Sequence, residues 1–306
     1  MKIFILKKKH IATFLILFIL ILSTLFLLSL SKSEELINVI APINNNKSTY
    51  LDLNGDNTDD TIEIISKDDN SDVKITIGNK NYFLSKLCDD NTLGKVKSHW
   101  PIMVFAQQVS RSSTPEIIVQ TSNPKSLIYI FKWVDGEFKK IFSSNKNIFG
   151  ILDSSGNKTP QCYSLNSYEG NSSLESFMII DDSIVDITKD CNKIPDLANI
   201  LSLIDLLQKD YELDDIPDIF SQNISESELG LLWNLDKEHN LYSFQDAFFY
   251  DESLDNAGNI TSMKWRLSFE KYVRDRDDSS KSEVVFYVNT TKDSENNYKI
   301  SSIYKK

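Results

Sequence analysis

The stretch Asp52-Leu53-Asn54-Gly55-Asp56-Asn57-Thr58-Asp59-Asp60 carries side-chain oxygens at loop positions 1, 3, 5 and 9, which are Asp52, Asn54, Asp56 and Asp60. Hard cations such as Ca²⁺ take about six to eight oxygen ligands, and acids at alternate positions of a tight loop turn their oxygens toward one centre. The carbonyl of Thr58, at position 7, is a further candidate ligand. We therefore expect a structural Ca²⁺ in this acidic loop (residues 52–60). The alternative is a polar turn closed by hydrogen bonds from its own Asp and Asn side chains.

Short apolar runs separated by turn residues surround the acidic loop and predict an all-β region over residues 49–192. Asp135-Gly136 between apolar flanks predicts a tight hairpin. Residues 181–183 predict a second tight turn. No helix is expected before about residue 195. The expected strands cover residues 61–66, 73–78, 82–84, 102–107, 116–121, 127–133, 138–142, 149–152, 176–180 and 184–188.

A weak internal repeat runs through this region. A short strand, a polar loop of about nine residues and a second strand recur over residues 50–65, 104–119 and 151–165. The spacing of about 50 residues is typical of one four-stranded propeller blade per repeat. The second loop (residues 107–115) contains no acid, and the third keeps only Asp153.

With the strand that follows it, the acidic loop resembles the calcium loop of FG-GAP/VCBS-type repeats in integrin-like β-propellers, which have the pattern D-x-N-G-D-G-x-x-D. The resemblance implies that Asp52, Asn54, Asp56 and Asp60 bind Ca²⁺. It also implies an incomplete, propeller-like domain of about three blades, whereas complete propellers usually have at least four. Asn57 replaces the glycine at position 6, and Asn tolerates a positive φ better than most side chains. EF-hand loops are similar too, but their flanking helices are not expected here.

Residues 193–306 change to an α+β pattern. Apolar residues at helical spacing predict a helix over residues 196–209. A second helix is expected from the cap Ser225, with Glu228 completing a capping box, to about residue 238. The order of elements resembles NTF2-like or cystatin-like domains. The expected strands of this antiparallel meander cover residues 243–250, 260–274, 282–290 and 298–304.

The N-terminus predicts membrane insertion. Three lysines at residues 7–9 precede an uncharged apolar run over residues 11–30, which is long enough as a helix to span a hydrocarbon core of roughly 30 Å. We expect residues 1–31 to form a cytoplasmic tip and a transmembrane signal-anchor, and residues 32–48 to form a linker. The protein would then be a single-pass protein of the cell membrane with most of its chain extracytoplasmic. A cleaved signal peptide is the alternative.

Charge and cysteine content narrow the function classes. The chain has 33 Lys and Arg, of which four lie in the first 31 residues, so the exported part has 29 basic and 44 acidic residues, a net charge of −15. Such a charge disfavours nucleic acid as a partner. Cys88, Cys162 and Cys191 show no zinc spacing, and their odd number leaves at least one unpaired. Pairing of Cys162 with Cys191 stays open.

The carboxylates of the C-terminal part are interpreted as structural. Asp246, Asp251 and Glu252 are expected to be solvated groups at a strand end, and Arg266 is expected to pair with Glu270 on one strand face. The aromatic residues of the segment 244–250 are expected in the core, with a ligand cavity as the alternative.

No motif of a nucleophile, a phosphate loop or another catalytic constellation is present, so the sequence predicts no enzyme. The expected function is a membrane-anchored binding or scaffold protein with a structural Ca²⁺, whose partner is a cell-envelope protein or glycan such as peptidoglycan or a polysaccharide. The alternative is an extracytoplasmic enzyme or small-ligand sensor that uses a pocket in residues 196–306.

Overall fold

The computed structural model describes residues 18, 42–43, 47–110, 112–153, 159–209, 216–274 and 280–306. Residues 40–306 form one compact unit. Of the predicted anchor segment (residues 11–30), only Phe18 is among the described residues. Within the described part of the chain, no helix has the length and apolar content needed to cross a bilayer.

The first sheet has five strands, and the acidic loop connects its first two strands. Its order is β1-β2-β3-β4, with β5 pairing β3 at one end, and all its pairs are antiparallel. A short 3-10 helix, η2 (Leu84–Leu87), follows β4. The strands are β1 (Thr49–Leu51), β2 (Asp60–Lys67), β3 (Asn70–Ile77), β4 (Lys80–Phe83) and β5 (Gly94–Lys95).

The second sheet is a four-stranded antiparallel meander. Asp135 and Gly136 connect its last two strands with φ of 54° and 86°, which confirms the predicted hairpin. Its strands are β6 (Met103–Gln107), β7 (Glu116–Ser122), β8 (Ser126–Val134) and β9 (Glu137–Ser144).

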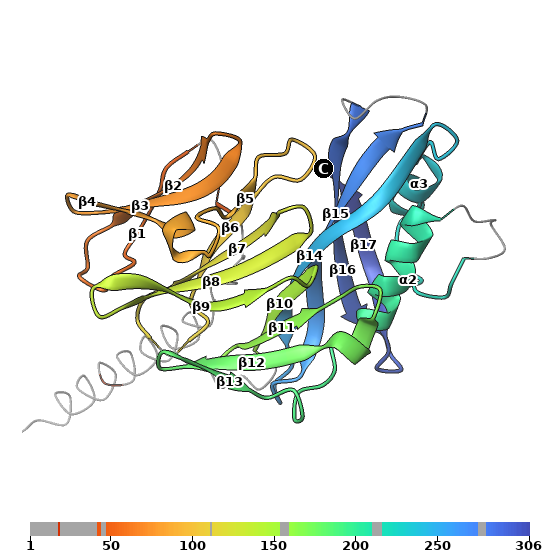
Figure 1. The fold of residues 1–306 in the computed structure, drawn as a ribbon. Coiled ribbons are helices and arrows are strands. Elements are labelled where there is room, and N and C mark those ends of the chain that lie inside the picture. Colours follow the sequence, from red (N-terminus) through yellow and green to blue (C-terminus); the bar gives the residue numbers. More distant parts are fainter. Residues whose placement is uncertain are drawn as a thin grey trace, which may run out of the picture. The chain divides into compact units, whose positions relative to one another are not determined.

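The third sheet has eight strands in the order β13-β12-β11-β10-β14-β15-β16-β17 (Figure 1). Neighbouring strands are antiparallel, except that β10 pairs with β14 in parallel. The predicted turn at residues 181–183 is present, with Asp181 at a φ of 53°. Its strands are β10 (Ile148–Leu152), β11 (Gln161–Leu165), β12 (Glu175–Ile180), β13 (Ser183–Asp186), β14 (Asn240–Leu254), β15 (Ile260–Val273), β16 (Ser282–Lys292) and β17 (Tyr298–Lys305).

The mostly β, antiparallel character of the prediction is confirmed, and none of the three sheets closes on itself. The antiparallel meander β14–β17 after the helices is also as predicted. Strands from both sides of the predicted boundary at residues 192 and 193 share the eight-stranded sheet. In addition, Ile43 of the predicted linker donates its backbone N–H to the carbonyl of Val104 in β6 at 2.7 Å.

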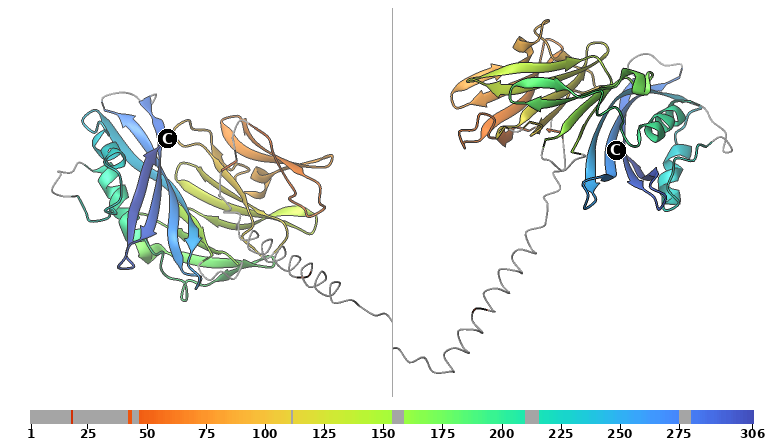
Figure 2. Two further views of the ribbon diagram at one scale, coloured as in Figure 1. Left: turned by 180° about the vertical axis from the view of Figure 1, so that it is seen from behind. Right: turned by 90° about the horizontal axis from the view of Figure 1, so that it is seen from below.

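The two predicted helices are present, α2 (Leu197–Gln208) and α3 (Glu226–Trp233). The capping box at α3 is confirmed, because Ser225 Oγ accepts from the backbone N–H of Glu228 and the Glu228 carboxylate accepts from the N–H of Ser225. The helix ends before Asn234 rather than near residue 238, and Asn is a poor helix former. Both helices lie against one face of the eight-stranded sheet (Figure 2). A second 3-10 helix, η3 (Gly170–Ser173), follows β11.

Three hydrophobic cores separate the layers of residues 40–306. One lies between the first and second sheets, one between the second and third sheets, and one between the third sheet and the helices. Strand β7 shows the principle, since Ile117 and Val119 point into the first core and Ile118 points into the second. Successive side chains of a strand face opposite sides, so a strand that lies between two sheets has both of its faces buried, as all of β7 is. The sheets therefore stack face to face in chain order.

Candidate functional site

The first half of the acidic loop folds onto the carboxylate of Asp52. Its Oδ1 accepts from the backbone N–H of Gly55 at 2.7 Å and of Asn54 at 3.2 Å. Its Oδ2 accepts from the N–H of Asn57 at 2.8 Å. Gly55 and Asn57 have φ of 81° and 64°, so Asn57 adopts the left-handed conformation that the family pattern assigns to glycine. The loop backbone thus wraps around its first acid.

The second half of the loop is held by shorter side-chain turns. Asp56 Oδ1 accepts from the N–H of Thr58 at 2.8 Å, and Asn54 Oδ1 accepts from the N–H of Asp56 at 2.9 Å. The Asn54 amide donates to Asp56 Oδ2 at 2.9 Å. The amide of Asn54 and the backbone of Thr58 hold the pKa of the Asp56 carboxyl below its usual value.

Asp60 closes the loop from its last position. It is only 3% exposed, and its Oδ2 accepts from the backbone N–H of Leu53 at 3.0 Å. Burial raises the pKa of Asp60, and the negative charges of Asp56 and Asp52 raise it further. The structure therefore brings Asp52, Asp56 and Asp60 close enough to repel one another.

The loop fits a hard cation in the type of its donors, which are oxygens, and in its compact backbone. The same oxygens also bind the loop's own backbone, as the alternative of a polar turn predicted. Among the described residues, no group of three or more His, Cys, Asp and Glu is arranged to hold a metal. Ca²⁺ at this loop stays a prediction.

The second copy of the repeat contains a carboxylate that the sequence analysis overlooked. Glu116 is fully buried, and its Oε2 accepts from the N–H of Val109 at 2.9 Å and of Ser110 at 3.2 Å. The buried ammonium of Lys132 lies 3.8 Å from Glu116 Oε1 and 3.1 Å from Asp182. The sequence does show an acid here, because Glu116 directly follows the second polar loop (residues 107–115).

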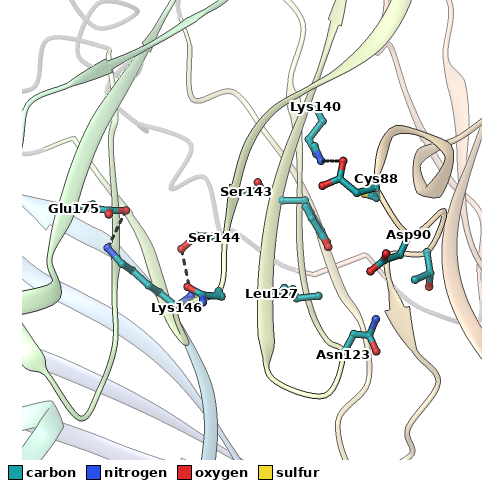
Figure 3. A pocket seen from close by; sticks show the side chains of 13 residues that line it. Cys88, Asp90, Asn123, Leu127, Lys140, Ser143, Ser144, Lys146 and Glu175 are labelled. Carbon is teal, nitrogen blue, oxygen red and sulfur yellow. Dashed lines mark hydrogen bonds and ion pairs between the residues drawn. The ribbon is translucent and has the colours of Figure 1, made fainter.

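A polar groove of about 510 Å³ opens beside the second sheet (Figure 3). Its walls come from residues 88–90 and Thr92, from Asn123 at the β7–β8 turn, from Tyr129 and Lys140 of β8 and β9, and from the segment 143–146 with Glu175. We call it the polar groove. Its residues are spread over 88 positions from Cys88 to Glu175, so no local sequence pattern predicts it.

The ammonium groups of the polar groove are paired. Lys140 lies 3.6 Å from Asp89, and Lys146 lies 2.8 Å from Glu175. Lys146 also donates to the carbonyl of Ser173 at 2.6 Å. A second cavity of about 490 Å³ lies on the first sheet, lined by residues of β2, β3 and β4.

The C-terminal carboxylates differ from their prediction. Asp246 is 2% exposed rather than solvated, and it accepts from Trp100 Nε1 at 2.5 Å and from Arg266 at 3.3 Å. Arg266 also donates to Glu283 at 2.6 Å, so its predicted pairing with Glu270 is wrong. Residues four apart on one strand are roughly 13 Å apart, whereas neighbours on adjacent strands are about 5 Å apart.

The other acidic side chains of the C-terminal region also contact residues on other strands or loops. Glu270 pairs with His99 at 3.3 Å and with Lys281 at 3.6 Å. Asp251 accepts from the N–H of Asp153 at 3.0 Å, and burial raises the pKa of the Asp251 carboxyl. Glu252 pairs with Lys264 at 2.5 Å.

The aromatic side chains of β14 are packed in the hydrophobic cores on both faces of the third sheet. Phe248 stacks on Phe105 with ring centroids 4.2 Å apart, and Phe249 stacks on Trp265 at 4.3 Å. Asp196, at the start of α2, is buried beside them and accepts from Trp265 Nε1 at 2.8 Å and from the hydroxyl of Thr290. Burial raises the pKa of Asp196 to about 6.

All three cysteines are free thiols, so the Cys162–Cys191 bond is not formed. Cys88 and Cys162 are buried, and burial raises the pKa of the Cys88 thiol to about 11. A thiol of that pKa is protonated and unreactive near neutral pH.

No protein-family model and no curated protein matches this chain.

Proposed function

We propose that the chain is an extracytoplasmic binding or scaffold protein, held at the cell membrane by its N-terminal apolar segment, with a protein or glycan of the envelope as partner. The observation that carries the proposal is the polar groove, a site of about 510 Å³. That volume falls within the range of about 300–1,000 Å³ that is usual for ligand sites. The three lysines at residues 7–9, before the apolar run, support the orientation.

In this proposal, the acidic loop holds one structural Ca²⁺. Asp52, Asn54, Asp56 and Asp60 would bind it through side-chain oxygens, and Thr58 would add its carbonyl. The cation would offset the repulsion among the three clustered carboxylates. Its contribution would be to the stability of the first sheet rather than to any reaction.

The proposal includes the family resemblance. Three antiparallel meanders, β1–β4, β6–β9 and β10–β13, follow one another and stack face to face. This order supports a partial, propeller-like stack of FG-GAP/VCBS type. The helices and the meander β14–β17 support an NTF2-like or cystatin-like second part.

A binding function is preferred over the alternative of an enzyme or sensor that uses residues 196–306. The aromatic side chains Phe244, Phe248 and Phe249 contact other rings in the cores. Neither of the two cavities described above is lined by residues 196–306. Buried carboxyls whose pKa is raised by burial, such as those of Asp196 and Asp251, are features that favour the alternative.

The test uses the full-length chain expressed in its membrane. External protease on intact cells is expected to digest residues 49–306 and to leave a short anchored fragment. Protection of these residues in intact cells, with digestion after lysis, would refute the orientation. The purified full chain in detergent is further expected to sediment with isolated cell-envelope material, and failure to sediment at any protein concentration would refute the binding function.

A further inference from the structure

The polar groove differs from a general surface depression in how its charges are arranged. Each lysine lies beside an exposed carboxylate, Lys140 beside Asp89 and Lys146 beside Glu175. In Figure 3 the Lys146–Glu175 pair lies at one end of the groove, and Cys88 and Asp90 lie toward the other. Counting Asp90, the lining carries three carboxylates and two ammonium groups. An anionic ligand would meet net negative charge and would have to displace an ion pair, which disfavours it.

The groups that remain available in the groove are neutral donors and acceptors, together with one carboxylate. Asn123, Asn145 and Ser143 make no side-chain hydrogen bond to any other residue that the structure describes, and neither does the carboxylate of Asp90. A side-chain amide has N–H donors and a carbonyl acceptor, and a hydroxyl group both donates and accepts. A carboxylate accepts from two neighbouring donors. This set matches a chain of hydroxyl groups, each of which both donates and accepts.

Tyr129 provides a flat surface in the same groove. It is half-buried in β8, and burial raises the pKa of its phenol to about 12, so that the ring stays uncharged. Tyrosine is amphipathic, with an apolar ring and a polar tip, and it recurs where a ligand has both kinds of surface. The groove has few other apolar side chains, chiefly Leu127 and the thiol of Cys88. Apolar peptide anchors, which need well-packed hydrophobic pockets, therefore have little to bind.

We propose that the polar groove binds a neutral oligosaccharide chain, with the ring of Tyr129 against one sugar face and with Asp90 and Asn123 hydrogen-bonded to sugar hydroxyl groups. This inference rests on the proposed binding function and names the class of its ligand. The Lys140–Asp89 and Lys146–Glu175 pairs lie in the groove wall, and the net negative charge of the lining disfavours acidic sugars.

The test measures binding of chitotetraose, cellotetraose and maltotetraose to the full chain in detergent by saturation-transfer NMR and calorimetry. Tetragalacturonate serves as the anionic comparator and a peptidoglycan stem tetrapeptide as the peptide comparator. At least one neutral tetrasaccharide is expected to bind, and both comparators are expected to bind at least about tenfold more weakly. Tyr129→Leu is expected to lose binding, whereas Tyr129→Phe keeps the ring and is expected to retain it.

Asp90→Ala and Asn123→Ala are each expected to weaken binding by about tenfold or more. Asp190→Ala and Asn223→Ala, which change exposed side chains outside the groove, are the matched controls and are expected to bind like the unchanged chain. Thermal unfolding of every variant shows whether the fold is kept. Unaltered sugar binding in folded Asp90→Ala and Asn123→Ala would overturn the site.

Two further outcomes separate this inference from the proposed function. If no neutral sugar binds up to millimolar concentration while the chain still sediments with envelope material, the oligosaccharide is wrong and the binding function stands. Stronger binding of the tetrapeptide or of tetragalacturonate than of any neutral sugar would likewise overturn the ligand class. If the chain neither binds sugars nor sediments with envelope, both proposals fail.

Discussion

The carboxylate of Glu116 accepts a hydrogen bond from the backbone N–H of Val109, seven residues earlier in the chain, at 2.9 Å. Asp60 and Leu53 repeat this relation at 3.0 Å, again seven residues apart. In both cases an acid at the start of a strand, β7 or β2, closes the loop that precedes it. The two loops therefore share one backbone design, although only the first carries acids within the loop. In the second, the buried ammonium of Lys132 lies beside the closing carboxylate.

The cation prediction is tested at the acidic loop. Ca²⁺ is expected to raise the thermal midpoint of the full chain, because a ligand that binds only the folded state stabilises it by mass action. Asp56→Ala is expected to remove that shift. Asp190→Ala, which changes an exposed acid far along the chain, is the control and is expected to keep it. A calcium titration that leaves the midpoint of the unchanged chain in place would contradict the prediction.

The buried pair in the second loop is expected to be essential for stability. Glu116→Ala leaves the N–H groups of Val109 and Ser110 without their acceptor and removes one of the carboxylates beside the ammonium of Lys132. Removing one partner of a buried pair costs about 3–5 kcal/mol. Urea unfolding measures the change in the free energy of unfolding. Glu137→Ala, at an exposed position of β9, is the control and is expected to change it by less than about 0.5 kcal/mol. A loss at Glu116 no larger than at Glu137 would show that this loop closure is unimportant.

Asp196 is expected to make stability depend on pH. Its pKa in the folded chain is about 6 against 3.8 for the free group, so the folded state holds the proton more tightly than the unfolded state. The favourable effect is fully present below about pH 3.8 and is lost as pH rises through about 6, which amounts to about 3 kcal/mol for a shift of this size.

The Asp196→Asn variant cannot titrate at this position, so the stability it loses between about pH 4 and pH 6.5 should be smaller than in the unchanged chain. Urea unfolding across this pH range measures the difference, and the exposed Asp190→Asn is the control. Parallel stability curves for Asp196→Asn and the unchanged chain would contradict a raised pKa.

Gly150 is expected to tolerate no side chain. A Cβ at this position of β10 would lie 2.3 Å from the ring of Phe249, which itself stacks on Trp265. Overpacking of this kind costs typically about 1–3 kcal/mol, and Gly150→Ala is expected to reach the upper part of that range.

Gly230→Ala is the matched control for Gly150→Ala. Gly230 lies within α3, where the nearest atom to a Cβ is 3.9 Å away, so alanine fits and favours the helix. Thermal unfolding of the two variants should therefore shift in opposite directions. A Gly150→Ala chain as stable as the unchanged one would show that the contact between β10 and β14 is loose.

Local signals in the sequence determined most of the secondary structure. The Asp135-Gly136 turn and the capping box of Ser225 and Glu228 each depend on residues within a few positions of one another. The same holds for the hydrogen bonds of Asp52 within its loop. Such features are encoded by backbone preference and short-range hydrogen bonding, so they can be read without knowledge of distant residues.

Only the tertiary structure decided which distant residues meet. The parallel pairing of β10 with β14, the burial of Asp246 beside Trp100 and the contact of Lys132 with Asp182 join segments that periodicity alone cannot match. The pairing of Arg266 was mispredicted because sequence spacing was taken for spatial proximity, whereas adjacent strands bring its true partners closer. The polar groove has the same origin, since its walls come together only when the second sheet stacks between its neighbours. The sequence thus specified the secondary-structure elements and their turns, and the packing of the sheets created the polar groove.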